Sequence, residues 1–583
     1  MSRDTSISAP RKRLFSIITL LLPVILLLLL EGSIRLMGVA EDYPLFISAE
    51  GLPGYRQPNP AVISRYFGTP SAAPEISPDT HYFLAQKPED GFRIFVMGGS
   101  SAAGFPYGRF GSISGMLQQR VKRLFPDKEI EIISVAMSAI NSYAIRDFSD
   151  EVLAAQPDLV LIYAGHNEYL GIMGTGAVFS SFAGMHQLKL VYLALLDSHL
   201  FRLLQQVIIP LTSGEDPEVE RATLMARVAA GQRIPLADNR FEVGVAQFQD
   251  NIGTVLQRFK ENDVPVMLGT LVSNEEDLAP FVSGDESPNA DECYQKGQTL
   301  AAQGQFGQAL EQFQLARDLD LLRFRAPGIF NETLRFLAAE YDAILVDVES
   351  SFRRSAEHGL IGNQLLLEHV HPNRYGYFLM TEAYVEALIA SGLLGESTPY
   401  PSTASWQEIP LTNVDLLVAE KKIKNITTQF PFTDAFQYRS ELPDSIEPEL
   451  LRLGKARLDG TSWLAVQQDL LSYYQIQKEQ GEAARMAALL FDAIPNQART
   501  AYVAGQLYFA ARDWSMALYY HKKAIQLAPD NIDYLMMAGR SFMANNQPES
   551  ALVAVESVLT IDPDNKPARY QQARISQMLE QKP

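Results

Sequence analysis

The chain has 583 residues, 47% of them hydrophobic and 20% charged, which is the composition of a globular protein with about two or three domains. Its formal net charge of -19 argues against nucleic acid, or an anionic membrane surface, as a partner of the bulk of the chain. The single cysteine, Cys293, excludes an intrachain disulfide and a cysteine-ligated metal cluster, and we interpret it as a small packed residue.

The N-terminal region has the pattern of a membrane anchor. A basic tripeptide, Arg11-Lys12-Arg13, closes residues 1–13 and precedes a 17-residue apolar run from Leu14 to Leu30, which weakly polar residues extend toward residue 37. This length is at the lower limit for crossing a bilayer. Because basic residues mark the cytoplasmic side, residues 14–37 predict a single-pass membrane anchor, with the N-terminus in the cytoplasm and the bulk of the chain extracytoplasmic.

A cleaved signal peptide is the alternative for the same region. Gly38-Val39-Ala40 offers small residues at a suitable spacing for cleavage. Glu31 and Arg35 lie between them and a rather long apolar run, which favours an anchor that is not cleaved. Residues 38–90 then carry many prolines and little periodicity, and we expect an extended segment that packs along the next domain or spaces it from the membrane.

Five short apolar runs alternate with helical patterns and predict a parallel sheet with helices on both faces. The runs are Phe92–Met97, Ile130–Val135, Leu159–Tyr163, Val264–Leu271 and Ala343–Val348. Such sheets bind ligands at the carboxyl ends of their strands. The residues from 91 to 395 therefore predict one α/β domain with a site along that edge.

Polar residues follow the first three of these runs. They are Gly98-Gly99-Ser100, then Ala136-Met137-Ser138, then Gly165-His166-Asn167-Glu168. Glycines allow close approach of the backbone to a substrate, so Ser100, between a strand and a helix, is a candidate nucleophile. The bland alternative is an ordinary turn.

Two insertions interrupt the predicted domain. Residues 171–235 begin rich in glycine and turn helical; they either cover the site or simply pack on the domain. The second insertion, within residues 290–322, predicts a helical hairpin from Tyr294 to Leu319, in which Gly297 and Phe313 occupy packing positions typical of a tetratricopeptide repeat. Residues 396–460 have low periodicity and predict a linker.

A 34-residue period follows that linker. It predicts about three stacked helical hairpins from residue 464 to 579, within a region of residues 461–580, and resembles tetratricopeptide (TPR) repeats. Its markers are Pro495, Pro529 and Pro563, Ala483, Ala517 and Ala551, and the Ala-Gly pairs at 504 and 538.

A polar cluster, Glu368-His369-Val370-His371-Pro372-Asn373, precedes the last helical pattern of the α/β domain. A serine hydroxyl needs a base within hydrogen-bonding reach, and that base needs an orienting acceptor. His371 is the candidate base, and Glu368, three residues earlier, is the candidate acid. Pro372 suits the first turn of the helix.

Several of these residues have plainer interpretations. Asn167 could cap a following helix, because asparagine is a favoured cap. His369 is interpreted as a structural residue and His166 as a surface residue. A metal site built on His369 and His371 lacks an apparent third, separated ligand, so no metal and no cofactor is predicted.

The order Gly-x-Ser, Gly-x-Asn-acidic and acidic-x-x-His-Pro resembles the SGNH/GDSL hydrolase superfamily, and within it the membrane-anchored bacterial members fused to TPR repeats. The resemblance covers residues 90–395, and separately 464–579. It implies an α/β fold of SGNH type, a flavodoxin-like three-layer parallel sheet, joined to an all-α TPR solenoid and an N-terminal transmembrane helix.

Carried over by position, the resemblance implies that Ser100 is the nucleophile, His371 the general base and Glu368 the orienting acid. It also implies an oxyanion hole made by the backbone N–H groups of Ser100 and Ala136 and the side-chain amide of Asn167. Three residues depart from the family pattern: Gly99 replaces an aspartate, Ala136 replaces a glycine, and Glu368 replaces an aspartate.

The expected function is that of an extracytoplasmic serine esterase that cleaves an ester, such as an O-acylated glycan, through an acyl-enzyme. O-acyl transfer to a cell-envelope polysaccharide uses the same triad and is the second expectation. A third is an inactive domain that serves as a platform for repeats that bind a protein or peptide partner.

Overall fold

The computed structural model describes most of the chain, namely residues 9–38, 42–67, 73–175, 185–212, 225, 232–433 and 436–581. Within these residues, five parallel strands form a sheet in the order β5-β4-β6-β7-β8. This arrangement confirms the predicted parallel sheet. Its strands are β4 (Gly91–Gly98), β5 (Glu129–Ser134), β6 (Leu159–Tyr163), β7 (Val266–Gly269) and β8 (Ile344–Val346).

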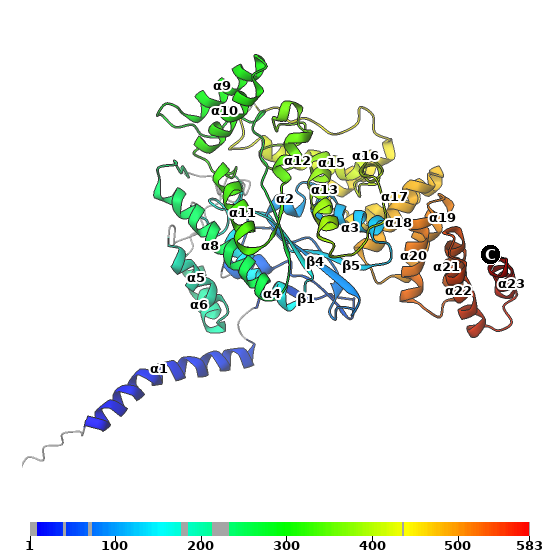
Figure 1. The fold of residues 1–583 in the computed structure, drawn as a ribbon. Coiled ribbons are helices and arrows are strands. Elements are labelled where there is room, and N and C mark those ends of the chain that lie inside the picture. Colours follow the sequence, from blue (N-terminus) through cyan, green and yellow to red (C-terminus); the bar gives the residue numbers. More distant parts are fainter. Residues whose placement is uncertain are drawn as a thin grey trace, which may run out of the picture.

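Helices cover both faces of this sheet, as Figure 1 shows. Three of them, α4 (Ser142–Ala154), α8 (Asn239–Glu261) and α11 (Gly328–Tyr341), pack side by side on one face. On the other face α3 (Ile113–Leu124) packs against α13 (Arg374–Ser391), which also contacts α12 (Val348–Ser355). Ile94, Phe95 and Val96 of β4 have no exposed surface, as expected for a strand with both faces covered.

The first helix, α1 (Ala9–Met37), extends away from the α/β domain (Figure 1). Its part from Ile17 to Met37 is long and apolar enough to cross a membrane. Leu20 and Leu28 are 75% and 66% exposed, so this helix presents apolar side chains that do not pack on the domain.

A small antiparallel sheet connects α1 to the α/β domain, and the proline-rich segment therefore packs along that domain. Phe46 of this sheet packs on Phe83 and on Phe95 of β4, with ring centroids 5.2 and 5.6 Å away. The three strands are β1 (Phe46–Ser48), β2 (Tyr55–Pro58) and β3 (Phe83–Leu84).

The two insertions form helical hairpins where the structure describes them. The first contains α5 (His186–Leu196) and α6 (His199–Thr212), while residues 176–184, 213–224 and 226–231 lie outside the described residues. The second, between β7 and β8, pairs α9 (Ala290–Ala302) with α10 (Phe306–Leu319) as predicted. A Cβ at Gly297 of α9 would lie 2.7 Å from the ring of Phe313, which explains the small residue there.

The segment predicted to be a linker, residues 396–460, contains three helices among its described residues, so that interpretation was wrong for its helical parts. These helices are α14 (Ser402–Gln407), α15 (Asn413–Thr427) and α16 (Pro448–Leu458). Buried side chains of α15 and α16 share a core with Phe110 of the α/β domain and Val466 of the repeats, so the segment packs between the two domains.

Stacked helices complete the chain and agree with the 34-residue period (Figure 1). Ala483, Ala517 and Ala551, one period apart, have no exposed surface, because neighbouring helices approach closely there. The helices are α17 (Trp463–Gln477), α18 (Gln480–Ala493), α19 (Ala498–Ala510), α20 (Trp514–Leu527), α21 (Ile532–Ala544), α22 (Pro548–Ile561) and α23 (Lys566–Glu580).

Candidate active site

Ser100 lies at the carboxyl end of β4, where α2 (Ser100–Ala103) begins. Gly98 must be a glycine, because a Cβ there would lie 2.1 Å from the backbone carbonyl oxygen of Tyr163. At Gly99 a Cβ would lie 2.8 Å from Nδ2 of Asn167, so a larger residue would require that side chain to shift. The turn therefore brings β4 against the end of β6 and places Ser100 next to the Asn167 amide.

His371 and Glu368 complete a hydrogen-bonded chain behind Ser100. Nε2 of His371 is 2.7 Å from Oγ of Ser100, although 270 residues separate the two in sequence. With its proton on Nδ1, the same imidazole donates to Oε1 of Glu368, whose side chain has no exposed surface. The second carboxylate oxygen accepts from Nδ1 of His369. One buried carboxylate thus orients two imidazoles, of which only His371 reaches the serine.

The loop that carries His371 is fastened to the start of α2. The hydroxyl of Ser101 donates to the carbonyl oxygen of Val370 at 3.0 Å, and the backbone N–H of Leu367 donates to the carbonyl oxygen of His371 at 2.8 Å. These bonds fix the loop relative to the serine. Sequence patterns gave no signal for Ser101, because its role depends on a partner in a distant loop.

The helix after this loop begins later than Pro372. Asn373 is its N-cap, and its side chain accepts from the backbone N–H of Gly376 at 2.8 Å. The expectation that Pro372 lies in the first helical turn was therefore wrong, since the capping residue follows the proline.

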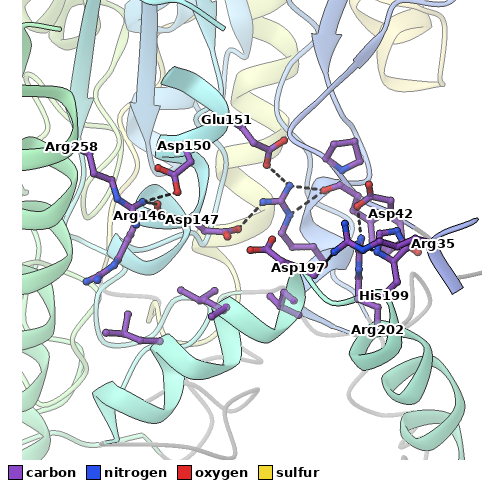
Figure 2. Close-up of a pocket in the computed structure, with 17 residues that line it drawn as sticks. Arg35, Asp42, Arg146, Asp147, Asp150, Glu151, Asp197, His199, Arg202 and Arg258 are labelled. Carbon is purple, nitrogen blue, oxygen red and sulfur yellow. Dashed lines mark hydrogen bonds and ion pairs between the residues drawn. The ribbon is translucent and has the colours of Figure 1, made fainter. Parts of the chain in front are cut away.

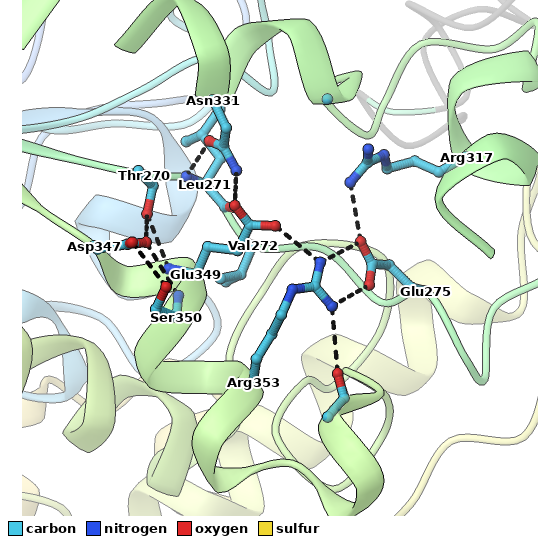
Figure 3. Close-up of polar contacts among 12 residues, drawn as sticks. Thr270, Leu271, Val272, Glu275, Arg317, Asn331, Asp347, Glu349, Ser350 and Arg353 are labelled. Atoms are coloured by element: carbon cyan, nitrogen blue, oxygen red, sulfur yellow. Dashed lines mark hydrogen bonds and ion pairs between the residues drawn. The ribbon is translucent and has the colours of Figure 1, made fainter. Parts of the chain in front are cut away.

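The loop after β7 supports the His369 backbone, and Figure 3 shows what holds that loop in place. The N–H of Asn274 donates to the carbonyl oxygen of His369 at 2.9 Å. The next residue, Glu275, is 2% exposed and accepts from Arg317 of α10 at 3.0 Å and from Arg353 of α12 at 2.9 Å. Two guanidinium groups on one carboxylate compensate for its burial.

Burial keeps the imidazoles of the site neutral. It lowers the pKa of His371 to about 3, so at neutral pH its Nε2 is free to accept the serine proton. It also lowers the pKa of His369 well below its usual value, and lowers that of His166 to about 3. The expectation of a surface position for His166 was wrong: the side chain is buried, and its Nδ1 accepts from the N–H of Ala326 at 3.2 Å.

Asn167 lies in a turn and caps no helix, which excludes the plainer interpretation of this residue. One N–H of its side-chain amide donates to the carbonyl oxygen of Ile140 at 3.0 Å. The amide nitrogen lies over Gly99, beside Ser100, and an amide nitrogen carries a second hydrogen.

The structure does not bring Ala136 to the cavity. Its backbone N–H donates to Oγ of Ser134 at 3.2 Å, and its side chain packs in the core. Ala139, three residues later, lines the cavity instead and has a φ of 61°, in the left-handed region that favours glycine. Two alanines so close in sequence cannot be told apart by pattern.

A cavity of about 170 Å³ opens beside Ser100. Its walls are mostly apolar and come from three regions, including the long first insertion through Met225 and α15 through Ile426. The lining residues are Ser100, Phe105, Ser138, Ala139, Asn167, Leu170, Gly171, Met225, Phe324, His369, His371 and Ile426.

The carboxylate and the two imidazoles are also the only group of potential metal ligands found among the described residues. One donor atom each from Glu368, His369 and His371 lies within 4.8 Å of the others. In the observed arrangement both carboxylate oxygens accept from imidazoles and His371 contacts Ser100, so these atoms are already engaged with one another.

No family model matches the sequence, and no curated protein matches it. Solved structures resemble separate parts of the chain. A putative lipolytic protein of the G-D-S-L family from Desulfitobacterium hafniense is 13% identical over 51% of this chain and 98% of its own, with a TM-score of 0.25. The acetylxylan esterase Axe2 from Geobacillus stearothermophilus is 12% identical over 52% of this chain and 96% of its own, with a TM-score of 0.27.

A third structure resembles the helical repeats. The first TPR domain of Spaghetti (RPAP3), bound to an HSP90 peptide, is 23% identical over 20% of this chain and 93% of its own, with a TM-score of 0.19.

Proposed function

We propose that the protein is a serine ester hydrolase of SGNH type that works through an acyl-enzyme. The observation that carries this proposal is the distance of 2.7 Å between Oγ of Ser100 and Nε2 of His371, with Glu368 buried behind the imidazole. A nucleophile, its base and an acid that orients the base are the elements that a serine hydrolase requires.

The reaction follows from this geometry. Oγ of Ser100 attacks the ester carbonyl while its proton moves to Nε2 of His371, and Glu368 stabilises the resulting imidazolium. The imidazolium then gives that proton to the leaving alcohol, and the acyl group stays on Ser100. Water, activated by the neutral His371, attacks the acyl-enzyme and releases the carboxylic acid and the free serine.

For the oxyanion hole we propose the N–H of Ser100, the side-chain amide of Asn167 and the N–H of Ala139. Ala139 takes the place that the resemblance gave to Ala136, because the latter's N–H is bound to Ser134. Each such donor typically contributes a factor of about 10²–10³ to turnover.

The small apolar cavity favours a short acyl group such as acetyl, and an acylated glycan is the proposed class of ester. A volume of about 170 Å³ beside the serine accommodates a few carbon atoms but not a long fatty acyl chain. Since the part of α1 from Ile17 to Met37 can cross a membrane and basic residues precede that part, we place the catalytic domain outside the cytoplasm of a bacterial cell, anchored to the inner membrane.

For the C-terminal repeats we propose a protein or peptide partner. Stacked helical hairpins form extended surfaces on which such partners bind, and α17–α23 form such a stack.

The test is covalent labelling of the full-length protein with a fluorophosphonate probe, followed by hydrolysis of p-nitrophenyl acetate. Wild-type protein should be labelled and should release nitrophenol, and Ser100→Ala should do neither. Ser101→Ala is the matched comparison: its hydroxyl bonds to Val370 rather than to His371, so labelling should persist, at a reduced rate because this bond helps to fix the loop of His371. Treatment with EDTA should leave labelling unchanged if Glu368 acts as the orienting acid and not as a metal ligand.

Two other outcomes would contradict the proposal in different ways. Labelling without hydrolysis would favour acyl transfer to a polysaccharide. Absence of labelling in folded wild-type protein would favour a platform without catalytic activity.

A further inference from the structure

We propose that the α5–α6 hairpin is a second membrane contact: the exposed apolar face of α5 lies in the interfacial region of the bilayer, beside the end of α1. This inference goes beyond the esterase activity and rests on the proposed role of α1 as an anchor. The partner is therefore a lipid surface.

The composition of α5 does not fit a helix that faces water. A surface helix normally presents polar side chains to solvent. The outer face of α5 instead presents Leu188, Val191 and Leu195, which are 45%, 54% and 42% exposed and follow one another at helical spacing. Met185, just before the helix, is 55% exposed. Exposed apolar patches of this kind mark interaction surfaces.

Hydrogen bonds fasten the hairpin to the end of α1. The carboxylate of Glu31, on α1, accepts from Oγ of Ser198 at 2.9 Å and from the backbone N–H groups of His199 and Leu200 at 2.9 and 2.8 Å. These are the first N–H groups of α6, so a side chain of α1 caps another helix. Arg35 of α1 adds a bond to the carbonyl oxygen of Asp197 at 2.8 Å.

The attachment of the hairpin to α1 indicates that lipid covers the apolar face of α5. If α1 spans a bilayer, the interfacial region of that bilayer surrounds its C-terminal end, where Leu36 and Met37 are 91% and 65% exposed. The α5–α6 turn is bonded to that same end, so the lipid surface reaches the hairpin. In Figure 1 the hairpin lies beside the end of α1 at which the chain enters the domain.

Charged side chains lie directly on the inner side of α5, and they indicate how deeply the hairpin can enter the membrane interface. A cavity of about 640 Å³ there is lined by α4, the inner face of α5 and the end of α1, and Figure 2 shows its charged side chains. Arg65 is paired with Asp147 at 2.8 Å and with Glu151 at 2.7 Å, and Arg258 with Asp150 at 3.3 Å. These charges belong to α4, to α8 and to the segment around Arg65, whereas α5 itself is mostly apolar, so a polar layer lies next to an apolar helix at the end of α1.

The experiment uses spin labels in the full-length protein, reconstituted into vesicles of phosphatidylethanolamine and phosphatidylglycerol. Cys293, the single buried cysteine, is replaced by alanine, and one new cysteine is introduced by Leu188→Cys, Val191→Cys or Leu195→Cys. Each nitroxide's collision rates with oxygen and with a water-soluble nickel complex are compared. Leu28→Cys in α1 gives the lipid reference, and Val553→Cys on α22, 63% exposed, gives the matched aqueous control.

We expect the ratio of oxygen to nickel accessibility at the three α5 sites to be several times that at Val553→Cys, and to approach that at Leu28→Cys. If the ratios at the α5 sites equal that at Val553→Cys while the ratio at Leu28→Cys is high, the hairpin does not contact the membrane, although α1 still does. That result would overturn the inference. Low accessibility to both reagents with spin–spin broadening would show a second copy on this face and would also overturn it. If the ratio at Leu28→Cys is as low as that at Val553→Cys, α1 is not in the membrane, and both the anchor and this inference are wrong. Fluorophosphonate labelling tests the esterase proposal independently.

Discussion

Ala139 has a backbone conformation that costs an alanine free energy. A left-handed residue with a Cβ is about 1–2 kcal/mol less stable than the right-handed form, and only glycine avoids this cost. The φ of 61° directs the chain so that Ala139 lines the cavity with Asn167 and Ser100. Ala136, by comparison, has no left-handed conformation and is buried, with 1% of its surface exposed.

Replacing each alanine by glycine should therefore have opposite effects on stability. Ala136→Gly removes a buried methyl group and adds backbone entropy to the unfolded chain, so the free energy of unfolding should fall by about 1–2 kcal/mol. Ala139→Gly removes the left-handed penalty and should raise it by up to about 1 kcal/mol. Urea unfolding of both variants checks this, and destabilisation by Ala139→Gly would contradict the assigned conformation.

The buried position of His371 determines the pH at which activity is lost. The base must be neutral to accept the serine proton, so kcat/KM falls as the pH drops through the pKa of His371. Because burial lowers that pKa to about 3, the acid limb of the profile should lie below pH 6.5, the usual value for histidine. Hydrolysis of p-nitrophenyl acetate between pH 4 and 8 tests this, because kcat/KM should show no loss between pH 6.5 and 5, with circular dichroism at each pH as a check on folding. An acid limb at or above 6.5 would contradict the geometry.

At the level of elements, the strands were predictable and the segment after the α/β domain was not. Apolar runs located all five strands of the parallel sheet to within two residues at either end, because a strand covered on both faces has an almost continuous apolar sequence. The helix α15 was missed because its packing partners are far away in the sequence: Val414 packs in the same core as Phe110 and Val466.

Within the candidate site, too, residues that a local sequence pattern marks were predictable, and residues whose role depends on the folded chain were not. Ser100, His371 and Glu368 were chosen from their types and order, and the structure places Oγ of Ser100 2.7 Å from Nε2 of His371, with Glu368 hydrogen-bonded to the same imidazole. The residue after β5 that we propose for the oxyanion hole could not be chosen from sequence, since the φ of Ala139 and the hydrogen bond of Ala136 are set by the folded chain.

Because α15 contributes Ile426 to the cavity, this helix should influence acyl-chain preference. Ile426→Ala removes part of the apolar wall and should raise kcat/KM for butyrate esters relative to acetate esters. The matched control is Lys421→Ala, an exposed position on the same helix, for which the ratio should not change. Kinetics with p-nitrophenyl acetate and butyrate test this, and an unchanged ratio in Ile426→Ala would separate α15 from the acyl-binding site.

Over the whole molecule, the repeats are attached to the α/β domain through α3. Lys122 of α3 forms a buried ion pair with Asp492 of α18 and donates to the hydroxyl of Tyr520 at 3.0 Å. Arg109 donates to the carbonyl oxygen of Asp492 at 2.8 Å, and Arg123 donates to Asp513 at 2.9 Å. The repeats and the α/β domain are thus packed together, and a partner bound to the repeats would be held at a fixed position relative to Ser100.

The buried pair gives a direct test of this attachment. Asp492→Asn leaves the Lys122 ammonium group buried without its counter-ion, and breaking such a pair typically costs about 3–5 kcal/mol. This free-energy cost weakens the contact between the two domains, so calorimetry should show the repeats unfolding at a lower temperature than the α/β domain, as a separate transition. Asp127→Asn is the matched control, because Asp127 pairs with Lys522 at 2.8 Å across the same contact but is 82% exposed. Surface pairs contribute less than about 1 kcal/mol, so that variant should unfold like the wild type. Equal behaviour of the two variants would show that α3 does not hold the repeats in place.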